Sequence, residues 1–189
     1  MAQQDVRYYL NGLMLEVSAN SLRAVATDGH RLAYCEKETT ADIADIKQVI
    51  LPRKGVLELV RLLSDSEDKV KVILGSNHLQ VEFGDLRLTS KLIDGRFPDY
   101  NRVMPTDGNN VITADRELLR QALIRASILS NEKYKGVRLE ASNGSVKIIA
   151  HNPQHEEAVE ELEADLNFEQ LAIGFNVVYL LEALTAIDA

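Results

Sequence analysis

The feature that most constrains the fold of this 189-residue chain is an internal repeat, in which a strand and a helix are followed by three strands. One copy spans roughly 60 residues, a period at which repeated units are expected to share one architecture. Apolar runs between turn formers predict the strands, at 8–16, 22–26, 32–35, 49–51, 69–74, 79–83, 86–92, 111–112, 136–140, 145–150, 156–163 and 171–173. Written as units, the chain is βββ, βαβββ, βαβββ and βα. Each helix can offer an apolar face to a sheet, so the repeat predicts an α+β fold.

Three helices are predicted by apolar residues that recur at helical spacing. The first begins at Pro52, which suits the first position of a helix, and ends at the acidic run 65–68. Thr113 can cap the second, with Asp115 and Glu117 in its first turn, and the third follows the 175–176 pair. The expected apolar faces are Val56, Leu59, Val60 and Leu63; Leu119, Ala122, Leu123 and Ala126; and Val177, Leu180, Leu181 and Leu184.

Turn-forming residues divide the chain. Asp28-Gly29 and Asn143-Gly144 are expected to join neighbouring strands as hairpin turns. A denser cluster of Gly, Pro, Asn and Asp lies between residues 94 and 110. This segment is the best candidate for a linker between two domains.

Charge and composition exclude several classes of protein. The formal net charge is −8, whereas proteins that hold nucleic acid by bulk charge are usually basic, so any DNA contact is expected to be local and weak. No apolar run approaches the ~20 residues of a membrane helix, and the N-terminal residues lack the pattern of a signal peptide, so no membrane partner is expected. The single cysteine, Cys35, excludes an internal disulfide and favours the reducing cytoplasm.

The stretch VATDGHRLAY places Asp28 and His30 close together, as in a catalytic or metal site. One alternative is therefore a small metal-dependent hydrolase centred on these two residues, which metal analysis and a His30→Ala variant would test. No further acid, base or ligand converges on them in the sequence. His151 and His155 have the spacing of a helical metal pair, but they flank Asn152-Pro153, which breaks helices. Neither a metal ion nor another cofactor is therefore expected.

Six stretches, in one consistent order and spacing, resemble a known family. They are QDVRYYLNG, VATDGHRLA, LPRKGVLELVRLL, SKLIDGRFPDY, LSNEKYKGVRL and IGFNVVYLLEAL, which begin at residues 4, 25, 51, 90, 129 and 173. In these stretches the chain is similar to bacterial DNA polymerase III β subunits, the sliding clamps. The resemblance implies a DNA-clamp fold of repeated βαβββ units, with sheets on the outside and helices facing the interior of a ring.

The resemblance also implies how the chain divides. Residues 1–104 would be the middle clamp domain without its first strand and helix, and residues 105–189 the first part of the C-terminal domain without its last three strands. Family members form a homodimeric ring. With such ends, the helix face of Val177, Leu181 and Leu184 is expected to be unburied. Exposure of apolar surface to water costs ~25 cal/mol of free energy per Å². Exchange of elements in a swapped dimer would cover this face, and a shortened chain explains the same ends without exchange.

The function that the resemblance implies is that of a processivity factor in bacterial DNA replication, with no catalytic activity of its own. The intact ring encircles duplex DNA and slides on it in the cytoplasm. Its other partners are the α and δ subunits of DNA polymerase III and further clamp-binding proteins, which dock by short hydrophobic peptides. A protein-interaction scaffold that is not a clamp is a second alternative, which would keep the fold but fail to bind a peptide with leucine and phenylalanine.

The resemblance further implies a peptide groove. Its wall would consist of Arg7, Leu10, Thr27, Gly29, His30, Arg31, Leu32, Pro98, Arg102 and Val103. The apolar members can hold a leucine or phenylalanine anchor, and the arginines can donate to peptide carbonyls or to a carboxylate. Gly29 lets the backbone turn close to a ligand. In the family, the extreme C-terminus also contributes to the groove.

A second implied set contacts DNA and consists of Gln4, Tyr8, Tyr9, Lys54, Arg61 and Arg120. The glutamine can bond a phosphate, and a tyrosine can stack or donate its hydroxyl. The three basic residues lie opposite the apolar helix faces and would face DNA through water. Two plainer interpretations stay open: the basic residues form an ordinary solvated helix face, and the two tyrosines occupy opposite faces of a strand.

Overall fold

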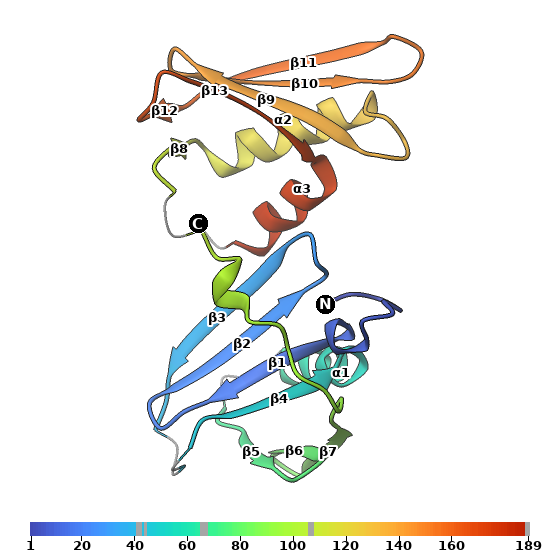
Figure 1. Ribbon diagram of the computed structural model, residues 1–189, viewed down its shortest axis with the longest axis vertical. Helices are drawn as coiled ribbons and strands as arrows, with labels where there is room; N and C mark the ends of the chain where they lie inside the picture. Colours follow the sequence, from blue (N-terminus) through green and yellow to red (C-terminus); the bar gives the residue numbers. More distant parts are fainter. Residues whose placement is uncertain (41–42, 44, 65–67, 106–107, 188–189) are drawn as a thin grey trace. The chain divides into compact units, whose positions relative to one another are not determined.

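The computed structural model describes residues 1–40, 43, 45–64, 68–105 and 108–187. The chain forms two compact units, Met1–Val103 and Met104–Ala189 (Figure 1). Most of the acidic run expected to end the first helix, and residues 106–107 of the expected linker, lie outside the described residues. No helix in the described part of the chain is long and apolar enough to cross a membrane.

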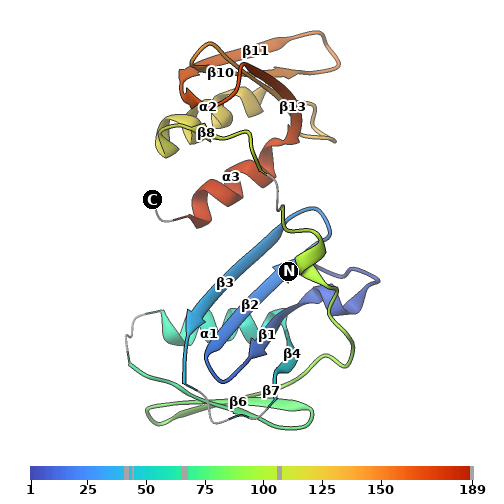
Figure 2. The same ribbon diagram turned by 60° about the vertical axis from the view of Figure 1, so that its left-hand side comes forward.

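The first unit contains two antiparallel sheets and one long helix. Its elements are η1 (Tyr8–Asn11), β1 (Gly12–Val17), β2 (Ser21–Thr27), β3 (Leu32–Glu38), β4 (Lys47–Pro52), α1 (Arg53–Leu63), β5 (Lys71–Leu74), β6 (His78–Phe83), β7 (Leu86–Lys91) and η2 (Tyr100–Arg102). The four-stranded sheet has the order β3-β2-β1-β4, and the three-stranded sheet has the order β5-β6-β7. Helix α1 covers one face of the four-stranded sheet (Figures 1 and 2).

Alternation along β1 gives the four-stranded sheet two different faces. On one face, Leu15 and Leu51 pack with Val56 and Leu59 of α1 and with Leu79 of β6. The opposite face carries a second cluster of buried residues, which are Met14, Val25, Ile50, Phe97 and Tyr100. The last two follow β7 in the sequence, so the segment after β7 folds back over the sheet and lies against this second face.

The elements of the second unit are β8 (Ile112–Thr113), α2 (Arg116–Ile128), β9 (Gly136–Ser142), β10 (Ser145–His151), β11 (Glu157–Glu163), β12 (Asp165–Leu166), β13 (Gln170–Asn176) and α3 (Val177–Ala186). In the second unit, α2 packs on the sheet and α3 packs beside α2 (Figure 2). The sheet has the order β11-β10-β9-β13, and β12 pairs with β8. Ala122, Leu123 and Ala126 of α2 are buried in one core with Val177 of α3 and Ile148 of β10.

The two units repeat one topology. The strand order β4-β1-β2-β3 of the first unit matches β13-β9-β10-β11 of the second, and a helix follows directly after both β4 and β13. Asn143 and Gly144 have φ values of 51° and 76° between the paired residues Ser142 and Ser145, as a two-residue hairpin turn requires. The internal repeat and the α+β class expected from the sequence are therefore confirmed.

The expected strand at 8–16 begins later than the sequence pattern suggests. Residues Tyr8–Asn11 form a 3-10 helix, and β1 starts at Gly12. The Asp5 backbone N–H donates to Asn11 Oδ1 at 3.0 Å, and Asn11 Nδ2 donates to the Asp5 carbonyl at 2.9 Å. These two bonds close residues 5–11 into a loop. The interpretation of Tyr8 and Tyr9 as opposite faces of a strand is therefore wrong.

The helix starts also differ from expectation. Pro52 is the last residue of β4 and precedes α1, whose first residue is Arg53. Thr113 lies in β8, and the cap of α2 is Asp115, whose Oδ1 accepts from the Leu118 N–H at 2.8 Å. Asp115 caps α2 in place of Thr113 because its carboxylate lies directly before the first turn, next to the unpaired N–H groups of that turn.

Two expectations about burial are corrected. Val60 was placed on the apolar face of the first helix, but its side chain is 63% exposed. The face of α3 was expected to be unburied, but Val177 is buried and Leu181 and Leu184 pack against the core that α2 helps to form. The packing of α3 beside α2 supplies the cover, so the main physical argument for a swapped dimer no longer holds.

Candidate peptide-binding site

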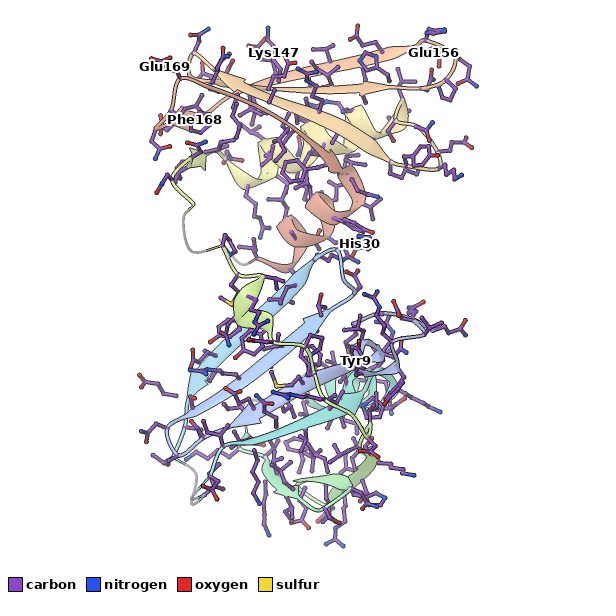
Figure 3. All side chains as sticks on the ribbon, in the orientation of Figure 1. Tyr9, His30, Lys147, Glu156, Phe168 and Glu169 are labelled. Atoms are coloured by element: carbon purple, nitrogen blue, oxygen red, sulfur yellow. The ribbon has the colours of Figure 1, made fainter. Side chains whose placement is uncertain are left out.

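A cavity of about 310 Å³ lies in the first unit, on the sheet face covered by the segment after β7. Its lining comes from three parts of the chain: η1, the β2–β3 hairpin and residues 97–103. The lining residues are Arg7, Tyr9, Leu10, Thr27, Gly29, His30, Arg31, Leu32, Phe97, Pro98, Asp99, Tyr100 and Val103. Figure 3 labels Tyr9 and His30, which come from two of these parts. Side chains far apart in the sequence therefore share one small hollow, of a size suited to a few side chains of a ligand.

The β2–β3 hairpin loop is held by its own side chains. Asp28 Oδ1 accepts from the backbone N–H groups of His30 and Arg31, at 3.0 and 3.1 Å. Arg31 Nε donates to Asp28 Oδ2 at 3.0 Å. Thr27 Oγ1 donates to the Arg31 carbonyl at 2.7 Å and accepts from the Gly29 N–H at 3.0 Å. The loop is thus fixed before any ligand arrives.

The same bonds determine the charge state of Asp28. Partial burial alone would raise the pKa of its carboxyl, but the donors from the His30 and Arg31 backbone and from the Arg31 side chain outweigh it. The pKa of Asp28 therefore lies below its ordinary value. A carboxylate that accepts three hydrogen bonds and holds its proton weakly is a poor general base. This geometry does not favour a hydrolase centred on Asp28 and His30.

Gly29, in the hairpin loop, lies close to the side chain of Arg7, the residue before η1. Its φ is +90°, a backbone conformation that residues with a Cβ rarely adopt. A Cβ at this position would lie 3.1 Å from Nη2 of Arg7. The Arg7 guanidinium is held in place by Asp5, with Nε at 3.0 Å from Oδ1 and Nη2 at 2.8 Å from Oδ2. These bonds from Arg7 lower the pKa of Asp5 to about 2.

The third wall is the segment from Phe97 to Val103. Phe97 and Tyr100 are buried in the cluster of Met14, Val25 and Ile50 and fix the segment on the sheet. Asp99 Oδ1 accepts from the Asn101 N–H at 3.3 Å, and the Val103 N–H donates to the Tyr100 carbonyl at 3.1 Å. Leu10, Leu32 and Pro98 add apolar surface to the cavity.

The structure brings together nine of the ten residues that the resemblance implied for a peptide groove. The exception is Arg102, whose side chain is 84% exposed and pairs with Asp99 at 3.1 Å rather than lining the cavity. Four lining residues were not expected there: Tyr9, Phe97, Asp99 and Tyr100. The sequence did contain a signal for Phe97 and Tyr100. They are large aromatic residues in the turn-rich segment 94–110, and such residues favour burial over exposure in a linker.

The residues implied for DNA contact come from the segment before η1, from η1 itself and from the helices α1 and α2. Gln4 is exposed with φ 55°, and Tyr8 is exposed with its ring edge-on to Tyr9 at 5.8 Å. Tyr9 is half-buried and is also one of the residues that line the cavity.

The basic members of the DNA set are on helices. Lys54 is exposed at the start of α1. Arg61 pairs with Glu58 at 2.9 Å, and Arg120 of α2 pairs with Glu117 at 3.7 Å. Each arginine is therefore partly neutralised by a glutamate one turn before it.

A larger depression of about 1080 Å³ lies in the second unit, and it contains no residue of either implied set. Its polar lining includes Asp115, Glu161, Glu163 and Asp165. Such a lining does not suit an apolar side chain, so the smaller cavity is the better candidate in spite of its size.

The two histidines at metal spacing do not form a helical pair. His151 ends β10 with Nε2 at 3.6 Å from Glu157, and His155 has φ 64° in the following turn. Among the residues that the structure describes, no group of three or more His, Cys, Asp or Glu side chains is placed to hold a metal ion.

The repeated βαβββ topology defines an α+β protein of the DNA-clamp class. Two family models match the chain in sequence: the DNA polymerase III beta subunit central domain over residues 1–99, and the C-terminal domain of the same subunit over residues 101–189. The chain therefore belongs to the family of DNA polymerase III β subunits, and the resemblance seen in six stretches of sequence is confirmed.

Relatives named Beta sliding clamp are similar over almost the whole chain. One from Pseudomonas putida is 55% identical over 184 residues, which are 97% of this chain and 50% of the relative. One from Escherichia coli K12 is 49% identical over 99% of this chain and 51% of the relative. The chain thus spans about half the length of the curated relatives it matches.

Solved structures confirm the fold. The DNA polymerase III subunit beta of Pseudomonas aeruginosa superposes with a TM-score of 0.95 at 54% identity, over 98% of this chain and 50% of that one. A sliding clamp of the same organism bound to griselimycin gives 0.96 at 53% identity, over 100% of this chain and 51% of that one. One from Bartonella birtlesii bound to griselimycin gives 0.93 at 37% identity, over 100% of this chain and 52% of that one.

Proposed function

We propose that the chain forms part of a bacterial sliding clamp, a non-catalytic processivity factor for DNA replication in the cytoplasm. Two subunits of the intact protein would close a ring around duplex DNA and slide along it. In this arrangement residues 1–104 belong to the middle domain and residues 105–189 to the C-terminal domain. Family membership and the repeated clamp topology support the proposal.

Retention on DNA in the proposed ring is topological. A closed ring cannot leave a long duplex by dissociation, so its affinity need not come from tight contacts. The acidic net charge of −8 and the pairing of Arg61 and Arg120 with glutamates suit such weak contacts, because strong phosphate binding would slow sliding. Gln4, Tyr8, Tyr9, Lys54, Arg61 and Arg120 are the proposed DNA contacts.

The cavity of the first unit is the proposed docking site for short hydrophobic peptides. The observation that supports this proposal is the cavity itself, which is lined by nine of the ten residues that the resemblance implied. Leu10, Leu32 and Pro98 give the lining apolar surface, and Arg7 and Arg31 add guanidinium groups to it. Such a site takes a leucine or phenylalanine side chain and donates to the peptide backbone. The proposed clients are the α and δ subunits of DNA polymerase III and repair proteins.

Fluorescence anisotropy with a labelled five-residue peptide that contains leucine and phenylalanine tests this proposal. A peptide with both residues replaced by alanine is the matched control. Saturable binding of the first peptide alone, weakened at least about tenfold by Leu32→Ser, is expected from the loss of apolar contact. Equal binding of both peptides, or none, would reject the site; metal-dependent turnover that His30→Ala abolishes would instead support the hydrolase.

A further inference from the structure

A polar row crosses the sheet face that carries the candidate pocket. Strand register places Gln48 of β4, Glu16 of β1, Arg23 of β2 and Glu36 of β3 side by side. Two residues closer to the pocket, a parallel row consists of Ile50, Met14, Val25 and Tyr34. The first three residues of this second row belong to the buried cluster that holds Phe97 and Tyr100.

The polar row is continuously hydrogen-bonded. Glu16 is only 7% exposed, yet both of its carboxylate oxygens are satisfied: Oε1 accepts from Arg23 Nη1 at 2.8 Å and Oε2 from Gln48 Nε2 at 2.6 Å. Arg23 Nε donates to Glu36 Oε1 at 2.8 Å. Partly buried ion pairs of this kind add little net stability, because desolvation offsets their attraction. Their use here is to hold the Glu36 carboxylate in one orientation.

Tyr34 connects the two rows. Its hydroxyl donates to Glu36 Oε2 at 2.5 Å, whereas its ring lies in the apolar row, with its centroid 5.9 Å from that of Tyr100 and an interplanar angle of 39°. Tyr100 is 6% exposed and lines the cavity. Within the part of the chain that the structure describes, the segment that carries Tyr100 pairs with a strand only through the bridge of Ile93 to Ile50. Side-chain packing therefore has to hold this segment in place.

We infer that Tyr34 is a positioning residue of the peptide pocket: the polar row fixes the Tyr34 ring, and that ring holds Tyr100 and the 97–103 wall in a shape ready for ligand. This role rests on the proposed function, since it assigns Tyr34 to the site that takes the peptide. A pre-formed aromatic wall raises affinity because less conformational freedom is lost on binding. Neither Tyr34 nor Glu36 lines the cavity, so both would act through Tyr100.

Three variants separate positioning from simple stability. Tyr34→Phe removes the hydroxyl and keeps the ring, Glu36→Ala removes its acceptor, and the double variant removes both. Glu38→Ala is the matched control, because it deletes the same side chain type on β3, one position further along the same face. Two quantities are measured: the Kd of the labelled leucine/phenylalanine peptide, and the NMR signal of the Tyr100 ring in protein with ring-labelled tyrosine.

Each single variant is expected to weaken peptide binding about fivefold, the effect of one hydrogen bond. The double variant should also weaken it about fivefold and not 25-fold, because both changes remove one shared bond. The Tyr100 signal should shift in all three variants and stay unchanged in Glu38→Ala. Additive losses, or an unchanged Tyr100 signal, would overturn the inference. If the unaltered protein fails to bind the peptide while Tyr100 still responds, the proposed function is wrong and the coupling of Tyr34 to the wall stands.

Discussion

The guanidinium groups around the pocket are each held by an aspartate two or three residues away. Arg7 pairs with Asp5 at 2.8 Å and Arg31 with Asp28 at 3.0 Å. Arg102, which does not line the cavity, pairs with Asp99 at 3.1 Å in the same way. Such short-range pairs contribute little to global stability when exposed. They do restrict the rotamers of long side chains, so that donors stand in place around the apolar floor.

Gly29→Ala is expected to lower the stability of the protein and also to weaken peptide binding. The residue has φ +90°, and a Cβ would lie 3.1 Å from Arg7 Nη2, so the substitution both strains the loop and displaces the arginine. Gly84→Ala is the matched control, with φ +53° and no atom within 4 Å of its Cβ. Both should lose about 1 kcal/mol in denaturant unfolding, but only Gly29→Ala should weaken the peptide. Equal affinities would show that the contact with Arg7 has no role.

Asp5 should titrate at about pH 2 rather than near 3.8, because the Arg7 side chain and backbone N–H donate to it. A pKa that is depressed in the folded state adds stability above the unfolded pKa. That stability is lost as the pH falls from about 4 through about 2. Carboxyl NMR titration would show this midpoint, and Arg7→Met should return it towards 3.8. A midpoint near 4 in the unaltered protein would mean that the pair does not form in solution.

The sequence predicts which residues come together at the site better than it predicts the directions of their side chains. Nine of the ten residues that the resemblance implied for the groove line one cavity, because the fold brings together η1, the β2–β3 hairpin and residues 97–103. Arg102, on η2, pairs with Asp99 and is exposed to solvent instead of lining this cavity, and the role of all ten residues in peptide binding remains a prediction. The resemblance implied that Tyr9 contacts DNA. The direction of the Tyr9 side chain depends on the 3-10 helix Tyr8–Asn11, which cannot be recognised from the alternating pattern of a strand.

At the scale of elements, the hydrophobic pattern predicted the strands well and their ends poorly. β11 reads as acidic and could pass for helix, yet its alternating burial identifies it as a strand. Among the described residues, the two-residue strands β8 and β12 pair with each other and with no other strand. A strand as short as β12 has no alternating pattern that the sequence could reveal. Helix starts depend on which side chain reaches the first free N–H groups, and this is a matter of geometry more than of composition.

The cap of α2 gives an element-scale prediction. Asp115→Ala should destabilise the second unit by about 1 kcal/mol, because the Leu118 N–H loses its acceptor. Thr113→Ala is the control, since Thr113 lies in β8 before the helix begins. Thermal unfolding of both variants decides between the two caps. A larger loss for Thr113→Ala would restore the cap that the sequence pattern suggested.

At the scale of the whole molecule, negative charge is unevenly distributed. Residues 1–103 contain 14 Lys and Arg against 15 Asp and Glu, whereas residues 104–189 contain 7 against 14. The nearly neutral first unit holds the candidate pocket and α1, and the acidic second unit carries glutamates along β11. The net negative charge of these 189 residues is consistent with the proposed retention on DNA by encirclement more than by attraction.

A polypeptide of these 189 residues is expected to bind linear duplex DNA weakly, with a Kd no tighter than ~10⁻⁶ M and a steep dependence on salt. The reason is that two units alone do not form the closed ring of the proposal. Lys54→Ala should weaken the residual binding, and Lys147→Ala, on the sheet of the second unit, should not. Tight and salt-resistant binding would contradict the topological mechanism.

Hydrogen–deuterium exchange with and without the leucine/phenylalanine peptide would show whether the cavity of the first unit holds the peptide. The segments 7–10, 27–32 and 97–103 contain the residues that line the cavity, so backbone amides in these segments should become protected on binding. The acidic depression at residues 142–145 and 161–165 should show no change. Protection confined to that depression, or peptide binding without protection around the cavity, would show that the cavity of the first unit is not the peptide site.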